Sequence, residues 1–271
     1  MAPSWSFSDE WAAHFDAGLT RTWDWEVQDR LEMFLTEIQM SPEDMRGLVI
    51  LDAGCGNGLL TEAIASLGAT VIGIDYSNSV HRIKRGKAIF VRGDLNRPPF
   101  TPNTFDVIFS SGVLHHNADT RASFDAVAEL AKDGGRFYVW LYRKVSGIKN
   151  RMIRAREALI RPVCSRLPHA AQVPIVKSDA ALQWLLTRFI GQKRTYAELI
   201  VASYDALTPR YAWKHHTPLD LARWFYENGY SVPTLTHWDN PNGYGVVAVK
   251  HRQTSTPGVN FSRHRSQVSA T

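Results

Sequence analysis

Short apolar runs alternate with segments of helical periodicity through the middle of the chain. The apolar runs predict strands at residues 48–51, 70–74, 88–91, 105–110 and 136–141. Between them, helical spacing predicts helices at 61–67 and at about 120–131, the second closed by Asp133-Gly134-Gly135. Strands that alternate with helices form a parallel sheet covered on both faces. Residues 48–142 are therefore expected to form an α/β core.

The segment before this core has a helical pattern and is rich in aromatic residues. Residues 1–47 contain Trp5, Phe7, Trp11, Phe15, Trp23 and Trp25. These side chains either pack against the core or form a lid that excludes water from a ligand. Ser41 and Pro42 predict the cap and first turn of a short helix just before the first strand.

The alternation stops after residue 141. Residues 143–216, here called the helical insertion, predict helices at 148–160, 180–189 and 196–203. The core pattern then returns in residues 217–251, where Thr217 caps a helix that has Pro218 in its first turn. Two strands at 231–238 and 245–250 are expected to form an antiparallel hairpin. Residues 252–271 contain few apolar residues and are expected to be a disordered tail.

Composition places the chain among ordinary globular proteins. Its 271 residues are 44% hydrophobic and 21% charged. No apolar run approaches the roughly 20 residues of a membrane span, and the N-terminus lacks the pattern of a signal peptide. The two cysteines, Cys55 and Cys164, are not expected to pair, because Cys55 lies inside a glycine-rich turn. We therefore expect a cytoplasmic protein.

The net charge of +5 is unevenly distributed. Cations gather at the start of the helical insertion, opposed only by Glu157: Arg143, Lys144, Lys149, Arg151, Arg154, Arg156, Arg161 and Arg166. Such a cluster is either a solvated helix face or a contact for an anionic substrate or a nucleic acid. The segment has no interleaved aromatic residues and no known binding motif, which disfavours nucleic acid.

Three glycines follow the first predicted strand at alternate positions. Gly54, Gly56 and Gly58 come after Val49-Ile50-Leu51-Asp52, and a helical pattern follows them. A strand, a glycine turn and a helix make a backbone-lined site for a nucleotide-like cofactor. The dinucleotide fingerprint G-x-G-x-x-G would require glycine at position 59, which is Leu59. The glycine spacing therefore disfavours a dinucleotide.

The whole set of motifs resembles class I S-adenosylmethionine (SAM) dependent methyltransferases, a superfamily that includes bacterial small-molecule enzymes. The matching segments are Leu51 to Gly58, Gly73-Ile74-Asp75-Tyr76-Ser77, Gly93-Asp94-Leu95, Phe105 to Ile108, Leu114-His115-His116 and Ala131 to Arg136. The resemblance covers residues 48–142 and 217–250. It implies a Rossmann-like, mostly parallel sheet of seven strands with the last strand antiparallel. It also implies SAM as cofactor and S-adenosylhomocysteine as product.

The expected cofactor residues all follow strand ends, where open parallel sheets bind ligands. Asp52 would accept hydrogen bonds from the cofactor ammonium, and Asp75 from the two ribose hydroxyls. Asp94 would accept from the adenine amino group, with the Leu95 N–H facing the ring and Tyr76 beside it. The resemblance carries over the remaining cofactor residues, and the complete set is Asp52, Gly54, Cys55, Gly56, Asp75, Tyr76, Asp94, Leu95 and Ser110.

The candidate catalytic residues are His115 and His116, after the fourth predicted strand. Histidine can take a proton from a hydroxyl or an amine near neutral pH, although these two residues can equally support the loop. The candidate acceptor-binding residues are Tyr142, Tyr204, Tyr211, His215 and His216. Helix capping and aromatic packing are the alternative explanation for the last four. No metal site is expected, since no cysteine or carboxylate has suitable spacing.

The predicted function is transfer of a methyl group from SAM to an oxygen, nitrogen or carbon of a small-molecule acceptor, by in-line displacement. That acceptor could be anionic. One alternative is an RNA-directed methyltransferase that uses the basic insertion, although an Asn-Pro-Pro-Tyr type motif is missing. A protein that binds SAM without turnover is the other alternative.

Overall fold

The computed structural model describes residues 26–84, 86–143, 147–189, 195–208, 215–237 and 243–251. Within these ranges seven strands form one sheet, in the order β3-β2-β1-β4-β5-β7-β6. The strands are β1 (Val49–Ala53), β2 (Thr70–Asp75), β3 (Ile89–Arg92), β4 (Phe105–Ser111), β5 (Ala131–Tyr142), β6 (Thr234–Thr236) and β7 (Gly243–Val249). β7 runs antiparallel to both β5 and β6, whereas the pairs from β3 to β5 are parallel. The predicted fold class is confirmed.

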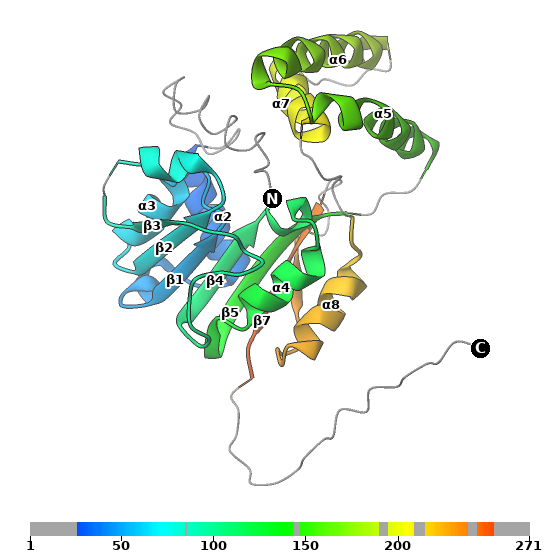
Figure 1. The fold of residues 1–271 in the computed structure, drawn as a ribbon. Helices are drawn as coiled ribbons and strands as arrows, with labels where there is room; N and C mark the ends of the chain where they lie inside the picture. Colours follow the sequence, from blue (N-terminus) through cyan, green and yellow to red (C-terminus); the bar gives the residue numbers. More distant parts are fainter. Residues whose placement is uncertain are drawn as a thin grey trace, which may run out of the picture.

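Helices cover both faces of this sheet (Figure 1). On one face, α2 (Val27–Ile38) and α3 (Leu59–Ser66) pack with Val107 and Phe109 of β4. On the other, α4 (Thr120–Ala128) and α8 (Pro218–Glu227) pack with Ile108 of β4. Neighbouring residues of β4 thus enter opposite apolar layers, because side chains alternate along a strand. This two-sided burial explains the continuous apolar runs of the central strands.

The segment before the core belongs in part to these layers. Phe34 and Ile38 of α2 are fully buried in the layer that also contains α3, so this helix contributes to the core. Ser41 caps the 3₁₀ helix η1 (Pro42–Met45) as predicted, and it forms a capping box with Asp44. The aromatic residues from Trp5 to Trp25 and the predicted tail at 252–271 lie outside the described residues.

β5 begins earlier than its pattern predicted. The helix expected at 120–131 ends at Ala128, and Asp133-Gly134-Gly135 lies inside β5. Gly134 N–H donates to the Lys250 carbonyl, and Lys250 N–H donates to the Gly135 carbonyl. Gly134 and Gly135, which resemble a turn in the sequence, are therefore held in β5 by pairing with the distant segment that contains Lys250. The final hairpin is confirmed, but its first strand is limited to Thr234–Thr236.

The helical insertion contains α5 (Ile148–Cys164), α6 (His169–Phe189) and α7 (Tyr196–Leu207), each longer than predicted. Figure 1 shows these three helices grouped apart from the sheet. A small apolar cluster of Cys164, Ala206 and Leu207 joins α5 to α7, and Ile175 of α6 packs against it. The Arg161 Nε–H donates to the Ala206 carbonyl at 2.8 Å. Cys55 and Cys164 are both free thiols. None of the described helices is long and apolar enough to cross a membrane.

Candidate cofactor and active site

The glycine turn after β1 has a backbone that side chains rarely adopt. Gly54, Gly56 and Gly58 have φ angles of +106°, +54° and +75°. The Gly54 and Cys55 N–H groups donate to the Ile74 carbonyl of β2, at 2.8 and 3.1 Å. A Cβ on Gly54 would lie 2.2 Å from a methyl carbon of Val113, in the loop after β4. Glycine is thus required both by conformation and by the close approach of that loop.

Asp75, at the end of β2, faces this turn. One carboxylate oxygen accepts from Gly56 N–H at 3.0 Å, and the other accepts from Ser77 N–H at 2.8 Å. Burial raises the pKa of Asp75, and the backbone hydrogen bonds from Ser77 and Gly56 oppose that rise. The arrangement places an acceptor beside the glycine backbone, as binding of a ribose requires.

Asp52 lies beneath the turn. Its side chain is buried, and one carboxylate oxygen accepts from the Thr61 hydroxyl of α3 at 2.7 Å. Burial raises the pKa of Asp52 to about 6, although the Thr61 hydrogen bond and the Arg30 charge lower it. In this structure Asp52 therefore connects the end of β1 to the first turns of α3, and its predicted contact with an ammonium stays a prediction.

The other predicted cofactor residues fall into two groups, one with exposed and one with buried side chains. Tyr76 is 42% exposed, and the exposed Asp94 carboxylate accepts from both Asn96 nitrogens at 2.9 and 2.7 Å. Cys55, Leu95 and Ser110 are buried, and the Ser110 hydroxyl donates to the Ala53 carbonyl at 3.0 Å. Ser110 therefore connects β4 to β1. Only Tyr76 and Asp94 in this group present side chains to a ligand at the surface.

The two histidines after β4 lie in the 3₁₀ helix η3 (Leu114–His116), close to the end of β5. The His115 ring centroid is 4.2 Å from that of His116 and 4.3 Å from that of Tyr142. His115 is fully buried, and neither of its ring nitrogens has a hydrogen-bond partner in the described part of the chain. Burial lowers the pKa of His115 well below its usual value, and burial lowers that of His116 to about 3. Both rings are therefore neutral at physiological pH.

A second pair of histidines joins this cluster from the end of the helical insertion. His216 N–H donates to the Tyr142 carbonyl at 3.3 Å, and the charges of both His215 and His216 act on the pKa of His115. Burial lowers the pKa of His215, with further lowering by Arg154 and Arg161 of α5. Tyr204 instead contacts His169 within the insertion, at 2.8 Å from hydroxyl to Nδ1. Tyr211 lies outside the described residues.

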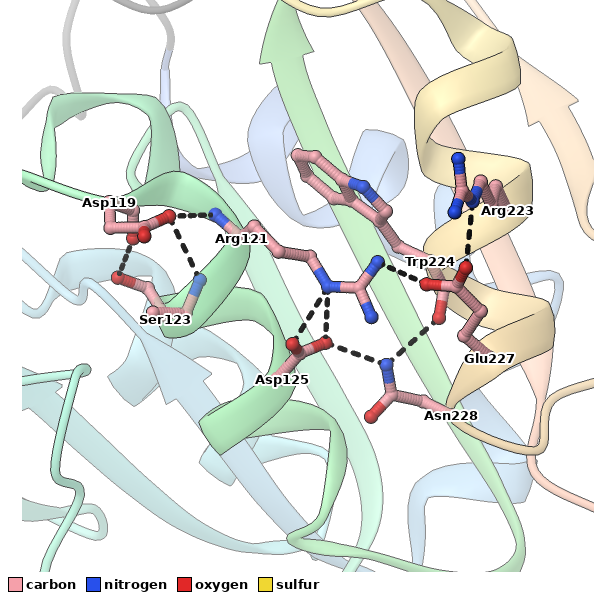
Figure 2. A network of polar contacts seen from close by, with 9 residues as sticks. Asp119, Arg121, Ser123, Asp125, Arg223, Trp224, Glu227 and Asn228 are labelled. Atoms are coloured by element: carbon pink, nitrogen blue, oxygen red, sulfur yellow. Dashed lines mark hydrogen bonds and ion pairs between the residues drawn. The ribbon is translucent and has the colours of Figure 1, made fainter. Parts of the chain in front are cut away.

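Trp224, which the sequence analysis did not single out, supports His216. Its ring packs edge-on against His216 with centroids 4.8 Å apart, and the Arg121 guanidinium lies over the Trp224 ring, 5.7 Å from its centroid. Figure 2 shows Arg121 of α4 between Asp125 and Glu227. The pair with Asp125 lies within α4, and the pair with Glu227 joins α4 to α8. Thr61 and Val113 are two further missed residues. Their partners come from distant segments, so no local sequence signal identifies them.

A family comparison decides between the uses of such a glycine turn. Residues 51–139 match the model of a methyltransferase domain. This segment is a SAM-dependent methyltransferase domain. It contains the glycine turn, Asp75, Asp94 and both histidines after β4. The expected cofactor, SAM, is thus confirmed for the domain, whereas the individual contacts stay predictions.

Curated relatives share this methyltransferase domain. The chain is 31% identical over 130 residues to a ubiquinone biosynthesis O-methyltransferase of Rhizobium etli (strain CIAT 652), which covers 45% of this chain and 52% of that protein. It is 30% identical over 141 residues to the mitochondrial enzyme of the same name from Schizosaccharomyces pombe, covering 45% and 51%. The chain therefore spans about half the length of the curated relatives it matches.

Solved structures support the fold. A SAM-dependent methyltransferase from Mesorhizobium loti aligns with a TM-score of 0.52 at 19% identity, over 79% of this chain and 96% of that one. The 1,6-didemethyltoxoflavin-N1-methyltransferase of Burkholderia thailandensis aligns with a TM-score of 0.52 at 14% identity, over 93% and 92%. At such identities the likeness concerns the fold alone.

Proposed function

We propose that the protein transfers a methyl group from SAM to a hydroxyl oxygen of a small aromatic acceptor. The glycine turn, Asp75 and Asp94 hold the donor in this proposal, with Asp52 below them. The O-methyltransferase names of the relatives support oxygen as the methyl acceptor. The aromatic rings around His115 support an aromatic acceptor, since Trp140 and Tyr142 have centroids 6.2 and 4.3 Å from its ring.

The observation that carries the proposal is the position of His115 relative to the glycine turn. Val113 packs against Gly54, and His115 follows two residues later with two unpartnered ring nitrogens. A neutral imidazole can accept the proton that a hydroxyl loses as its oxygen is methylated. His115 is thus assigned as the proton acceptor, and His116 as support for its ring.

The remaining residues of this chain align the acceptor and exclude water. SAM supplies an activated methyl group when bound, so catalysis needs chiefly an in-line approach of the acceptor oxygen. Arg154 and Arg161 create a positive potential at His215, which favours the ionised form of a phenol. The helical insertion at 143–216 closes over the acceptor in this proposal. Because His115 is fully buried, that closure must open for the acceptor to enter.

The proposal can be tested by methyl transfer from isotopically labelled SAM. The substrates are matched benzoates that carry a hydroxyl, an amino group or neither at the same ring position. Label is expected only in the product of the hydroxylated compound, and formation of S-adenosylhomocysteine should match it mole for mole. Transfer to the amino compound alone, or equal transfer to all three, would contradict O-methylation.

A further inference from the structure

The outer surfaces of α5 and α6 expose large apolar side chains. On α5, Met152, Leu159 and Val163 are 69%, 78% and 63% exposed, and their spacing places them on one side of the helix. On α6, the exposed apolar residues are Leu182, Leu185 and Leu186, at 55%, 51% and 56%. Single exposed apolar residues are ordinary, but several in a row along one side of a helix indicate an interaction surface.

The charges on these two helices have a single sign at the surface. The only acids in their sequences are Glu157 and Asp179, and both are buried. Glu157 pairs with Arg161 at 3.0 Å, and Asp179 lies 3.6 Å from Arg156. Among the side chains that the structure describes on or next to these helices, the exposed cations are Arg151, Arg154, Arg166 and Lys177. The apolar row is therefore accompanied by positive charge without an exposed acid.

We propose that α5 and α6 dock the protein on the surface of an anionic lipid bilayer. An amphipathic helix with cations beside its apolar side lies in the membrane interface, where anionic headgroups meet the cations and acyl chains meet the apolar residues. A second copy of this chain would place cations against cations. A nucleic acid would leave Leu159 and Met152 in contact with phosphates and not with a hydrocarbon phase.

The helix that carries this docking surface, α5, is adjacent to the proposed acceptor side of the methyltransferase domain. Arg154 of α5 acts on the pKa of His215, and His216 is bonded to Tyr142 beside His115. A docked α5 would thus hold the acceptor side close to the bilayer. Binding of the bilayer does not depend on methyl transfer, so the docking proposal can fail while the proposed function stands.

The test measures partition of the full chain into lipid vesicles by flotation. One set contains only phosphatidylcholine, and the other contains about 30% phosphatidylglycerol at low salt, where electrostatic attraction is strong. We expect binding to the anionic set to exceed binding to the neutral set by about tenfold or more. The double variant Met152→Gln, Leu159→Gln should bind the anionic set about tenfold more weakly than the unchanged chain.

A matched control is available on the core. Leu219 and Val232 are 77% and 93% exposed, so Leu219→Gln with Val232→Thr removes comparable apolar surface away from the insertion. This control should partition like the unchanged chain. A separate variant, Arg151→Gln with Arg166→Gln, should lose binding to anionic vesicles and leave the weak binding to neutral vesicles unaltered. Circular dichroism and titration with S-adenosylhomocysteine establish that each variant is folded.

Three results would overturn the proposal. The first is absence of binding to anionic vesicles. In the second, the control variant Leu219→Gln, Val232→Thr loses as much vesicle binding as the variant Met152→Gln, Leu159→Gln. In the third, the chain binds a short single-stranded RNA more tightly than it binds vesicles, and the double variant Met152→Gln, Leu159→Gln binds that RNA with unchanged affinity.

Discussion

The proposed donor side and the proposed acceptor side of the domain are built from different kinds of group. The donor side, at the ends of β1 and β2, consists largely of backbone: three glycines with positive φ and N–H groups held by Ile74 and Asp75. The acceptor side, at the ends of β4 and β5, consists of side chains: His115, His116, Tyr142 and His216. The donor side and the acceptor side meet where Val113 packs against Gly54.

This difference explains why sequence motifs identify the donor side but not the acceptor side. A backbone site needs glycine at fixed positions, so its sequence signature is local. A site made of side chains can be assembled from many residue types on distant segments, and an acceptor can change without a change in the donor motif. We therefore expect substrate choice to depend on the side chains that follow β4 and β5 and on those near the end of the helical insertion.

The largest expected effect comes from the junction of the two sides. Gly54→Ala should lower the free energy of unfolding by about 2–5 kcal/mol, since it combines a positive φ with a clash against Val113. Binding of S-adenosylhomocysteine should become undetectable. Urea denaturation and calorimetry measure the two effects.

Gly47→Ala is the matched control, because Gly47 has a φ of +80° and no atom within 4 Å of an added Cβ. It should cost only about 1–2 kcal/mol and leave binding intact. Equal losses for Gly47→Ala and Gly54→Ala would show that the Val113 contact has no role.

The next effect concerns the acceptor side alone. His115→Gln should reduce kcat about 100-fold, because glutamine cannot accept the proton. His116→Gln should cost less, since its ring only supports His115. A kcat of His115→Gln within about threefold of the unchanged enzyme would exclude His115 as the base.

The pH profile gives a second test of His115. Burial holds its pKa well below the usual value, so the ring stays neutral as the pH falls through about 6.5. We therefore expect kcat to lack an acid limb between about pH 7 and 5.5, provided that the acceptor does not titrate there. A half-maximal kcat near pH 6.5 would show a base with an ordinary histidine pKa.

The third effect concerns the donor side alone. Asp75→Ala removes the acceptor for two backbone N–H groups and the proposed ribose contact, so the affinity for S-adenosylhomocysteine should fall at least about tenfold, or about 1.4 kcal/mol. Asp94→Ala should have a smaller effect, because the Asp94 carboxylate is exposed and bonds only to Asn96. An Asp94 variant that loses more affinity than the Asp75 variant would reverse this assignment.

The last effect is a gain in stability, opposite in sign to the others. Burial raises the pKa of Asp52 from 3.8 to about 6, so its charged form costs stability, and that cost grows as pH rises from about 4 through 6. Asp52→Asn keeps an acceptor for Thr61 without the charge. At pH 8 the variant should be more stable by on the order of 1–3 kcal/mol, with no gain at pH 4. Urea denaturation of both proteins at pH 4 and at pH 8 tests this prediction. Protonation of the buried histidines at pH 4 affects both proteins alike, so it does not contribute to the difference in stability between them.

Much of the donor side could be predicted because its requirements are local. The glycines, Asp75 and the Thr217 cap all follow from the residue types at adjacent positions. The start of β5 could not be predicted, because Lys132 to Gly135 resemble a turn. In the structure Ala131 pairs with Phe105 of β4, and Gly134 and Gly135 form backbone hydrogen bonds with the distant Lys250. Trp224 and Thr61 likewise gain their roles from partners on other elements, His216 and Asp52.

The sequence predicted helices in the helical insertion but made each of them too short. Pro162 and Pro174 lie inside α5 and α6, where a local interpretation ends the helices early. Tertiary contacts continue them, including the hydrogen bond from Arg161 to Ala206. Its residue boundaries at 143 and 216, and its role as a cap over the acceptor, stay predictions.

The central claim is that the two sides have separate tasks, and one calorimetric comparison tests it directly. S-adenosylhomocysteine is titrated into the unchanged protein, Asp75→Ala and His115→Gln under identical conditions. The account predicts binding of one molecule per chain, weakened about tenfold or more in Asp75→Ala and altered by less than about twofold in His115→Gln. Equal weakening in both variants, or none in Asp75→Ala, would contradict the division between a donor side and an acceptor side.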